Sequence, residues 1–281
     1  MEYKTQPRKP TRDMPSAIIL MASGKMGKSA NTAKLTTDFA RGKAQVISLG
    51  VEGGYDMYEC NEINFTKYSE FDTYIDNLIK DQPYDFIILD HLSTLDEWSE
   101  MAGTLDYMSS GQGKSFNLKA GKINPEAKGP GLTNTNYNLY FLPGDKDFQS
   151  VHTLAKGSGY YWSRRRAIDW YNKIKRAAPY VIFNGHPKID RYTKDDTGKI
   201  VNSAFLDVTN GVSRFICKDI DAIASLYRKK DKAYLSFKHG TSDLDAGCRY
   251  DYLEGEEILI SEMVDGNLET YWEKIYPNYK K

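Results

Sequence analysis

The sequence has little cysteine and no net charge. Its 281 residues include three cysteines, Cys60, Cys217 and Cys248, which lie far apart without a CxxC pair. This spacing argues against a zinc site and a disulfide framework, and it suits a reducing compartment. Lysine plus arginine equal aspartate plus glutamate, at 38 each, so the formal net charge is zero. Any nucleic-acid binding must therefore come from a local basic patch.

Long apolar runs are absent as well. No run approaches the roughly 18 residues of a membrane span, and the chain starts with a polar segment instead of a signal peptide. A content of 40% hydrophobic and 27% charged residues is typical of a soluble globular protein. We therefore expect a cytoplasmic protein with no membrane partner, built as one large domain or two small ones.

Residues 1–15 contain three prolines and four lysines or arginines. This composition predicts a flexible, mildly basic arm. A solvated tail is one interpretation, and a contact with nucleic acid or with a neighbouring subunit is the other.

The motif on which the chain is centred is an apolar run that stops at a glycine-containing loop, residues 17–29, ending in Gly-Lys-Ser. A segment with helical spacing follows, which predicts the strand, phosphate loop and helix of a Walker A site. Backbone N–H groups and the helix N-terminus attract a polyphosphate. Lys28 would reach the β- and γ-phosphates, and Ser29 would place its hydroxyl on Mg²⁺. The residues predicted to bind the nucleotide are Ser23, Gly24, Lys25, Met26, Gly27, Lys28, Ser29 and Ala30.

The loop departs from the full Walker A pattern at one position. Ala22 stands five residues before Gly27, where a glycine is usual, and Gly24 lies inside the loop instead. Alanine is tolerated there if the position keeps a negative φ. An ordinary basic turn before a helix is the alternative interpretation of this segment.

Two further strands are predicted to end in acidic residues. The run 44–49 precedes Glu52, and open α/β sheets bind ligands at such strand ends. The run 86–89 is continuously apolar, as in a parallel strand covered on both faces, and Asp90 follows it. This pattern is typical of a Walker B strand, in which Asp90 holds Mg²⁺ directly or through water.

Residues 103–159 are rich in Gly, Asn, Ser, Lys and Tyr and show little periodicity. They predict an insertion, which is either a binding element or a disordered surface loop. The next segment interleaves aromatic residues with three arginines and continues as a helix. Aromatic faces stack on bases and guanidinium groups neutralise phosphates, whereas a solvated helix face is the alternative. The predicted single-strand-binding residues are Tyr161, Trp162, Arg164, Arg165 and Arg166.

Residues 180–183 predict another buried strand, which ends at Asn184 and His186. Either side chain could sense the γ-phosphate from the same sheet edge as Glu52 and Asp90, or His186 could simply cap a loop. The remaining sequence predicts strands on either side of a turn at 195–198, a second pair within 220–238, and a terminal helix beyond residue 254.

The order of these motifs resembles the RecA-like P-loop ATPases of phages, some of which are single-strand-annealing recombinases. The resemblance covers residues 16 to about 253. It departs at Ala22, at His91 where serine is common, and in the 103–159 insertion. The motifs that carry it are the Gly-Lys-Ser loop, Glu52-Gly53-Gly54, the run from Ile88 to Ser93, and Phe183 to His186.

The resemblance implies an α/β fold with a RecA-like P-loop core, a mostly parallel sheet flanked by helices, and a β-rich C-terminal part. It divides the chain into an arm (1–15), an ATPase domain (16–253) and a C-terminal extension (254–281). Glu52 would be the general base or water-orienting carboxylate, with Lys28 and His186 as further catalytic groups. Lys238 and Arg249 would complete a neighbouring subunit's site, as cations supplied in trans do.

The activity that follows is Mg²⁺-dependent ATP hydrolysis on single-stranded DNA by a homo-oligomeric ring or filament, in phage-type recombination or replication. Its location would be the host-cell cytoplasm if the chain is phage-encoded. Two alternatives stay open: a non-hydrolysing nucleotide-dependent binding module, and a P-loop kinase with a lid formed by Arg164 to Arg166.

Overall fold

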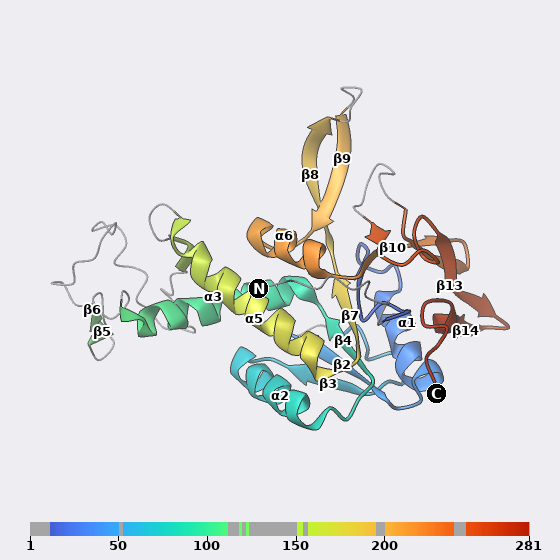
Figure 1. The fold of residues 1–281 in the computed structure, drawn as a ribbon, viewed down its shortest axis with the longest axis horizontal. Coiled ribbons are helices and arrows are strands. Elements are labelled where there is room, and N and C mark those ends of the chain that lie inside the picture. The colour runs from blue at the N-terminus through green and yellow to red at the C-terminus, as the bar shows by residue number, and fades with distance from the viewer. Residues whose placement is uncertain are drawn as a thin grey trace, which may run out of the picture.

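A ten-stranded sheet forms the centre of the computed structural model (Figure 1). The structure describes residues 12–50, 53–111, 118–119, 122–123, 151–153, 157–194, 200–238 and 246–280. Along the sheet the order is β14-β13-β11-β10-β1-β7-β4-β2-β3, and β12 pairs with β10. The strands that pair in parallel are β1 (Ala17–Met21), β2 (Ala44–Leu49), β3 (Glu62–Phe65), β4 (Phe86–Asp90), β7 (Tyr180–Gly185) and β10 (Ala222–Lys229).

Helices cover both faces of this sheet. Alternate residues of β1 belong to different clusters of the core: Ile19 packs with α2, α3, α5 and α6, and Ile18 packs with α1 and the C-terminal segment. Strands covered on both faces read as continuous apolar runs, which is why β1, β2 and β4 stand out in the sequence. The helices are α1 (Lys28–Lys34), which continues into a π-helix (Leu35–Phe39), α2 (Tyr68–Asp81), α3 (Leu92–Ser109), α5 (Tyr160–Ala177) and α6 (Asn210–Asp219). The predicted α/β architecture, with a large and mostly parallel sheet between helices, is confirmed.

The C-terminal tail is not the predicted helix. It forms two antiparallel strands that extend the sheet beyond β10 and β11, followed by a short 3-10 turn (Trp272–Lys274). Asp265 and Gly266 at the tip have φ values of 49° and 80°. An Asp-Gly pair with two positive φ angles is a strong signal for a two-residue hairpin, and the helix prediction overlooked it. The antiparallel strands are β11 (Lys232–Ser236), β12 (Gly247–Cys248), β13 (Glu257–Val264) and β14 (Asn267–Thr270).

The predicted start of the insertion at residue 103 is also wrong, because α3 continues to Ser109. Gly103 lies where α3 and α5 run side by side (Figure 1). A Cβ at Gly103 would lie 2.7 Å from the backbone N of Ser163. This glycine therefore permits close helix packing, although in the sequence it resembles the start of a loop. Within 112–150 the structure describes only two short paired strands, β5 (Leu118–Lys119) and β6 (Lys122–Ile123).

The strand pair predicted around the 195–198 turn is present as a two-stranded ribbon. It consists of β8 (Pro187–Lys194) and β9 (Ile200–Leu206), which pair antiparallel and project away from the sheet (Figure 1). The turn itself lies outside the described residues. Among the helices that the structure describes, none combines the length and the apolarity needed to cross a membrane.

Candidate functional site

The loop between β1 and α1 has the conformation that the phosphate-loop prediction requires. Gly27 has a φ of 98°, which favours glycine, and Lys25 has a φ of 65°. Ala22 keeps a φ outside this left-handed region, so the condition placed on alanine at this position is met. The first helical hydrogen bond runs from Asn31 N to Gly27 O at 3.0 Å, so α1 starts directly after the loop.

The Lys28 side chain folds back over the loop instead of extending into solvent. The residue is buried, and its Nζ donates to Ala22 O at 2.7 Å and to Ser23 O at 3.3 Å. His186 Nδ1 lies 3.5 Å from the same Nζ. The ammonium group is thus held by carbonyls of the loop at the end of β1, where a positive charge attracts a phosphate group.

Ser29 and Asp90 approach the same point in space, next to Gly54. A Cβ built on Gly54 would lie 3.0 Å from Ser29 Oγ and 4.0 Å from Asp90 Oδ2. A side chain at position 54 would therefore contact both oxygens. Hydroxyl and carboxylate oxygens are ligands that suit Mg²⁺. The residues present therefore fit a metal at this point, and Ser29 and Asp90 are the groups that would hold it.

Asn184 lies beside Asp90 in the sheet, because the two residues are paired in the register of β4 and β7. The side chain of Asn184 is fully buried. Its Nδ2 donates to Tyr55 Oη at 3.2 Å. Its Oδ1 has no hydrogen-bond partner in the described part of the chain. A buried carbonyl oxygen of this kind, next to a metal-site carboxylate, is consistent with a group that accepts a hydrogen bond from a ligand or from water.

Tyr55 is a site residue that the sequence prediction missed. Its ring is buried in the core cluster below α1, and its hydroxyl lies 2.8 Å from Thr32 Oγ1. Burial and the neighbouring charge of Asp90 raise the pKa of Tyr55 well above 10. A large aromatic residue directly after Gly53-Gly54 was the available signal, because an aromatic there indicates that the loop after β2 is anchored.

Two histidines meet at the ends of β4 and β7. The rings of His91 and His186 are in edge-to-face contact with centroids 4.7 Å apart. His91 follows Asp90 through a cis peptide bond and caps α3, with Thr94 N 3.4 Å from its Nδ1. His91 therefore has a capping role, while His186 contacts the lysine of the loop.

Two predicted residues, Lys238 and Arg249, are not brought into this site, and the position of a third cannot be compared with it. Glu52 lies outside the described residues. Lys238 forms an ion pair with Glu257 at 3.1 Å. Arg249 donates to the carbonyl oxygens of Asp219 and Lys218. Its backbone N donates to Asp221 O, directly before the start of β10, so Arg249 lies at the sheet edge opposite the phosphate loop. A role of Lys238 and Arg249 towards a second subunit stays a prediction.

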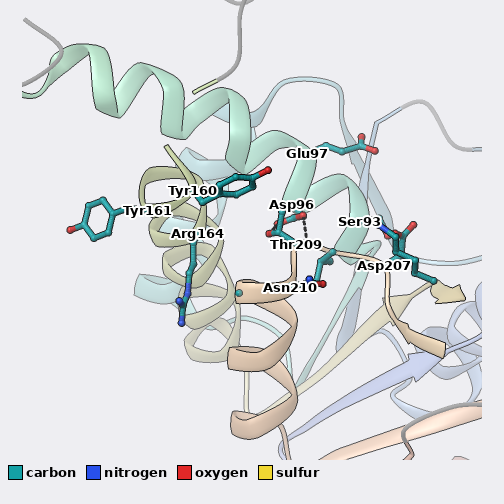
Figure 2. A pocket seen from close by; sticks show the side chains of 12 residues that line it. Ser93, Asp96, Glu97, Tyr160, Tyr161, Arg164, Asp207, Thr209 and Asn210 are labelled. Carbon is teal, nitrogen blue, oxygen red and sulfur yellow. Dashed lines mark hydrogen bonds between the residues drawn. The ribbon is translucent and has the colours of Figure 1, made fainter. Parts of the chain in front are cut away.

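Beside the two histidines lies a cleft of about 820 Å³ (Figure 2). It is bounded by the first turn of α3, the start of α5, β8 and the β9–α6 junction. Asp207 N, at the edge of the cleft, donates to His186 O at 2.9 Å, which places the cleft next to the phosphate loop. Asp96 accepts from Thr209 N at 2.7 Å and from Thr209 Oγ1 at 2.9 Å, linking α3 to α6. Burial raises the pKa of Asp96, although these hydrogen bonds oppose the increase.

The five aromatic and basic residues predicted to bind single-stranded DNA differ in their exposure to solvent. Tyr161 is 60% exposed and lines the cleft together with Arg164. Arg165 is exposed on the same helix. Trp162 is partly buried, with its ring beside that of Tyr107. Arg166 forms an ion pair with Asp106.

The Arg166 guanidinium binds both oxygens of Asp106, at 3.0 Å and 2.6 Å, and lies 3.5 Å from Asp72. This bidentate ion pair joins α5 to α3 and provides hydrogen-bond acceptors for the guanidinium group. The exposed members of the predicted set are therefore Tyr161, Arg164 and Arg165.

Comparisons with known proteins assign no family. No family model matches the chain, and no curated protein matches it. A solved structure that resembles it is that of a KaiC-like protein from the hyperthermophilic archaeon Pyrococcus horikoshii, with a TM-score of 0.40 and 9% identity, over 92% of this chain and 90% of that one. So low a likeness indicates no function.

Proposed function

We propose that this chain is a Mg²⁺-dependent ATPase of the RecA-like P-loop class that acts on single-stranded DNA as a homo-oligomer. The observation that carries the proposal is the convergence at one sheet edge of Lys28, folded over its loop, with Ser29 and Asp90 on either side of the space at Gly54. The role in phage-type recombination or replication rests on the motif resemblance alone.

Each group has a definite task in this proposal. The loop N–H groups and Lys28 hold the phosphates, and Ser29 and Asp90 hold the metal, which when bound neutralises charge on the phosphates. His186 and Asn184 lie at the end of β7, where they can detect whether a terminal phosphate is present. Glu52 is proposed to orient the attacking water from the strand next to that of Asp90. Phosphoryl transfer depends mainly on positioning and charge, so this arrangement is sufficient for slow turnover.

Support for a single-stranded partner comes from the cleft of Figure 2 and the helix beside it. Exposed tyrosine and arginine side chains at the start of α5 offer faces for stacking and charges for phosphates. The cleft borders the backbone of His186, so a strand bound there would lie near the group that contacts Lys28. Such a position allows DNA binding to stimulate hydrolysis.

The test is ATP turnover of Lys28→Ala with and without single-stranded DNA. We expect the variant to lose at least about a hundredfold in turnover, because one preorganised charge at the transferring phosphate is worth that much. Unchanged turnover would refute the phosphate site. Normal turnover in the wild type without DNA binding or stimulation would refute the DNA role and leave the ATPase. Mass measurement with an ATP analogue, with and without DNA, reports the assembly.

A P-loop kinase is the second candidate, because the cleft beside His186 is large enough for a small acceptor. Arg164 and Lys188 line it and could bind an anionic substrate, whereas Arg166 is held in its ion pair. Release of inorganic phosphate in the absence of other substrates supports the ATPase. Turnover that requires a small acceptor supports the kinase, and tight ATP binding without turnover supports a non-hydrolysing module.

A further inference from the structure

Tyr55 joins three parts of the candidate site through one hydroxyl group. Its Oη lies 2.8 Å from Thr32 Oγ1 on α1 and 3.2 Å from Asn184 Nδ2 on β7. Gly54, the residue before it, is the one whose Cβ would crowd Ser29 and Asp90. The helix after the phosphate loop, the strand beside Asp90 and the segment after β2 are thereby held together.

The direction of each hydrogen bond follows from the number of protons. Thr32 Oγ1 has one proton, and the carbonyl oxygen of Lys28, 2.9 Å away, can only accept it. Tyr55 must therefore donate its own proton to Thr32. Asn184 Nδ2 can only donate, so Tyr55 Oη accepts from it. The amide of Asn184 is thus fixed with its Oδ1 directed elsewhere, and this oxygen has no hydrogen-bond partner among the described residues.

The environment of Tyr55 keeps this chain of bonds intact. Burial, together with the charge of Asp90, raises the pKa of Tyr55 well above 10, so the phenol keeps its proton at neutral pH. The residue is 2% exposed, so bulk solvent does not reach the hydroxyl to compete for these bonds. An ordered polar network in a buried setting specifies one arrangement of its members.

We propose that Tyr55 is a positioning residue for the metal site, which orients Asn184 so that its Oδ1 accepts a hydrogen bond from water held by the cation. This inference rests on the proposed function. It explains why the buried amide oxygen of Asn184, the register partner of Asp90, has no hydrogen-bond partner among the described residues. Groups that orient the surroundings of a metal typically change its affinity or activity by 10–100-fold when removed.

The test is Tyr55→Phe, with calorimetric binding of a non-hydrolysable ATP analogue measured with and without Mg²⁺. We expect the affinity gained from Mg²⁺ to fall by about 10–100-fold, with metal-free binding unchanged. A merely structural role would lower both affinities equally, and that result would overturn the proposal. The proposal would also be overturned if Mg²⁺ increased the affinity of the variant for the analogue as much as it does in the wild type. We call this increase the Mg²⁺ gain.

Tyr276→Phe is the matched control. Tyr276 is also a fully buried tyrosine in the same core cluster, but its hydroxyl has no hydrogen-bond partner in the described part of the chain. Its removal should leave the Mg²⁺ gain intact. A loss equal to that of Tyr55→Phe would show that buried tyrosine hydroxyls act through stability in general, and it would refute the specific role of Tyr55.

A double-mutant cycle tests the connection to Asn184. Asn184→Ala should lose the same Mg²⁺ gain, and adding Tyr55→Phe to it should cost nothing more, because the two act through one bond. Additive losses would refute the mechanism. If Tyr55→Phe shows no cooperative thermal unfolding, Thr32→Val, which removes the acceptor of the tyrosine proton, replaces it in the cycle. A wild type that does not bind the analogue would refute the proposed function itself.

Discussion

At the scale of single residues, Gly54 leaves space beside Ser29 and Asp90 in the candidate metal site. The residue is exposed, and its φ lies outside the left-handed region, so its backbone does not require glycine. What disfavours a side chain is Ser29 Oγ, which lies 3.0 Å from the position that a Cβ would take and would have to shift. The absence of a side chain is therefore a property of the site and not of the turn.

Gly54→Ala should lower the apparent affinity for Mg²⁺ and should have little effect on folding. The added methyl group displaces Ser29 or enters the space between Ser29 and Asp90, so we expect the apparent Mg²⁺ affinity to fall about tenfold. Titration of ATP turnover with Mg²⁺ measures this change. Gly111→Ala is the control, since a Cβ there meets nothing within 4 Å. Equal Mg²⁺ affinity in the two variants would contradict the interpretation of Gly54.

The sequence predicted the residues of this site that belong to a local motif. Lys28, Ser29 and Asp90 follow strands at recognisable spacings, and all three lie at one sheet edge. Tyr55 and Thr32 could not be predicted, because their hydrogen bond joins residues from two separate segments. Nothing in a linear pattern indicates which buried hydroxyl will meet which helix.

At the scale of elements, the cleft of Figure 2 depends on the contact between α3 and α6. Asp96 supplies both hydrogen bonds of this contact, to the backbone and the hydroxyl of Thr209. Thr209 N is at the start of α6, where backbone N–H groups lack helical partners. A carboxylate from α3 therefore acts as the cap of α6.

Asp96→Ala should lower the free energy of unfolding by about 1–3 kcal/mol, because it leaves a partly buried N–H without an acceptor. Urea denaturation measures the change. Glu97→Ala, at the neighbouring exposed position, is the control and should stay within about 0.5 kcal/mol of the wild type. If both variants are equally stable, Asp96 does not hold α6 in place.

Helices and strands were predicted correctly where a strand is buried on both faces of the sheet. They were predicted wrongly where contacts between distant segments, and not the local sequence pattern, decide the structure. The range 44–49 is reproduced as β2 because its six residues are all buried. The insertion was predicted to start at Gly103, inside helix α3, because the close approach of α5 cannot be seen in the sequence. The tail was assigned as helix although its Asp265-Gly266 turn specifies a hairpin.

At the scale of the whole molecule, the C-terminal segment supports the helix that carries the phosphate loop. Trp272 is fully buried, and its Nε1 donates to Asn31 O, on α1, at 3.0 Å. Residues that sequence analysis placed in an extension therefore extend the central sheet and contribute to the core below α1.

Trp272→Ala should destabilise the protein by about 3–5 kcal/mol, the usual cost of removing a large buried aromatic side chain. Thermal or chemical denaturation measures this loss. Met263→Ala on β13 is the control, because Met263 is 42% exposed and its truncation leaves no cavity. A loss below about 1 kcal/mol for Trp272→Ala would show that the tail is dispensable for the core.

The sequence by itself determined the class of fold, strands β1, β2, β4 and β7, and the lysine, serine and aspartate of the candidate phosphate and metal site. These features depend on local spacing and on burial patterns that the chain carries in order. Tertiary structure alone decided that Tyr55 meets Thr32 and Asn184, that Gly54 leaves space beside Ser29, and that the tail joins the sheet. The physical reason is that hydrogen bonds and close contacts between distant segments depend on how the elements pack, and a linear pattern does not contain that packing.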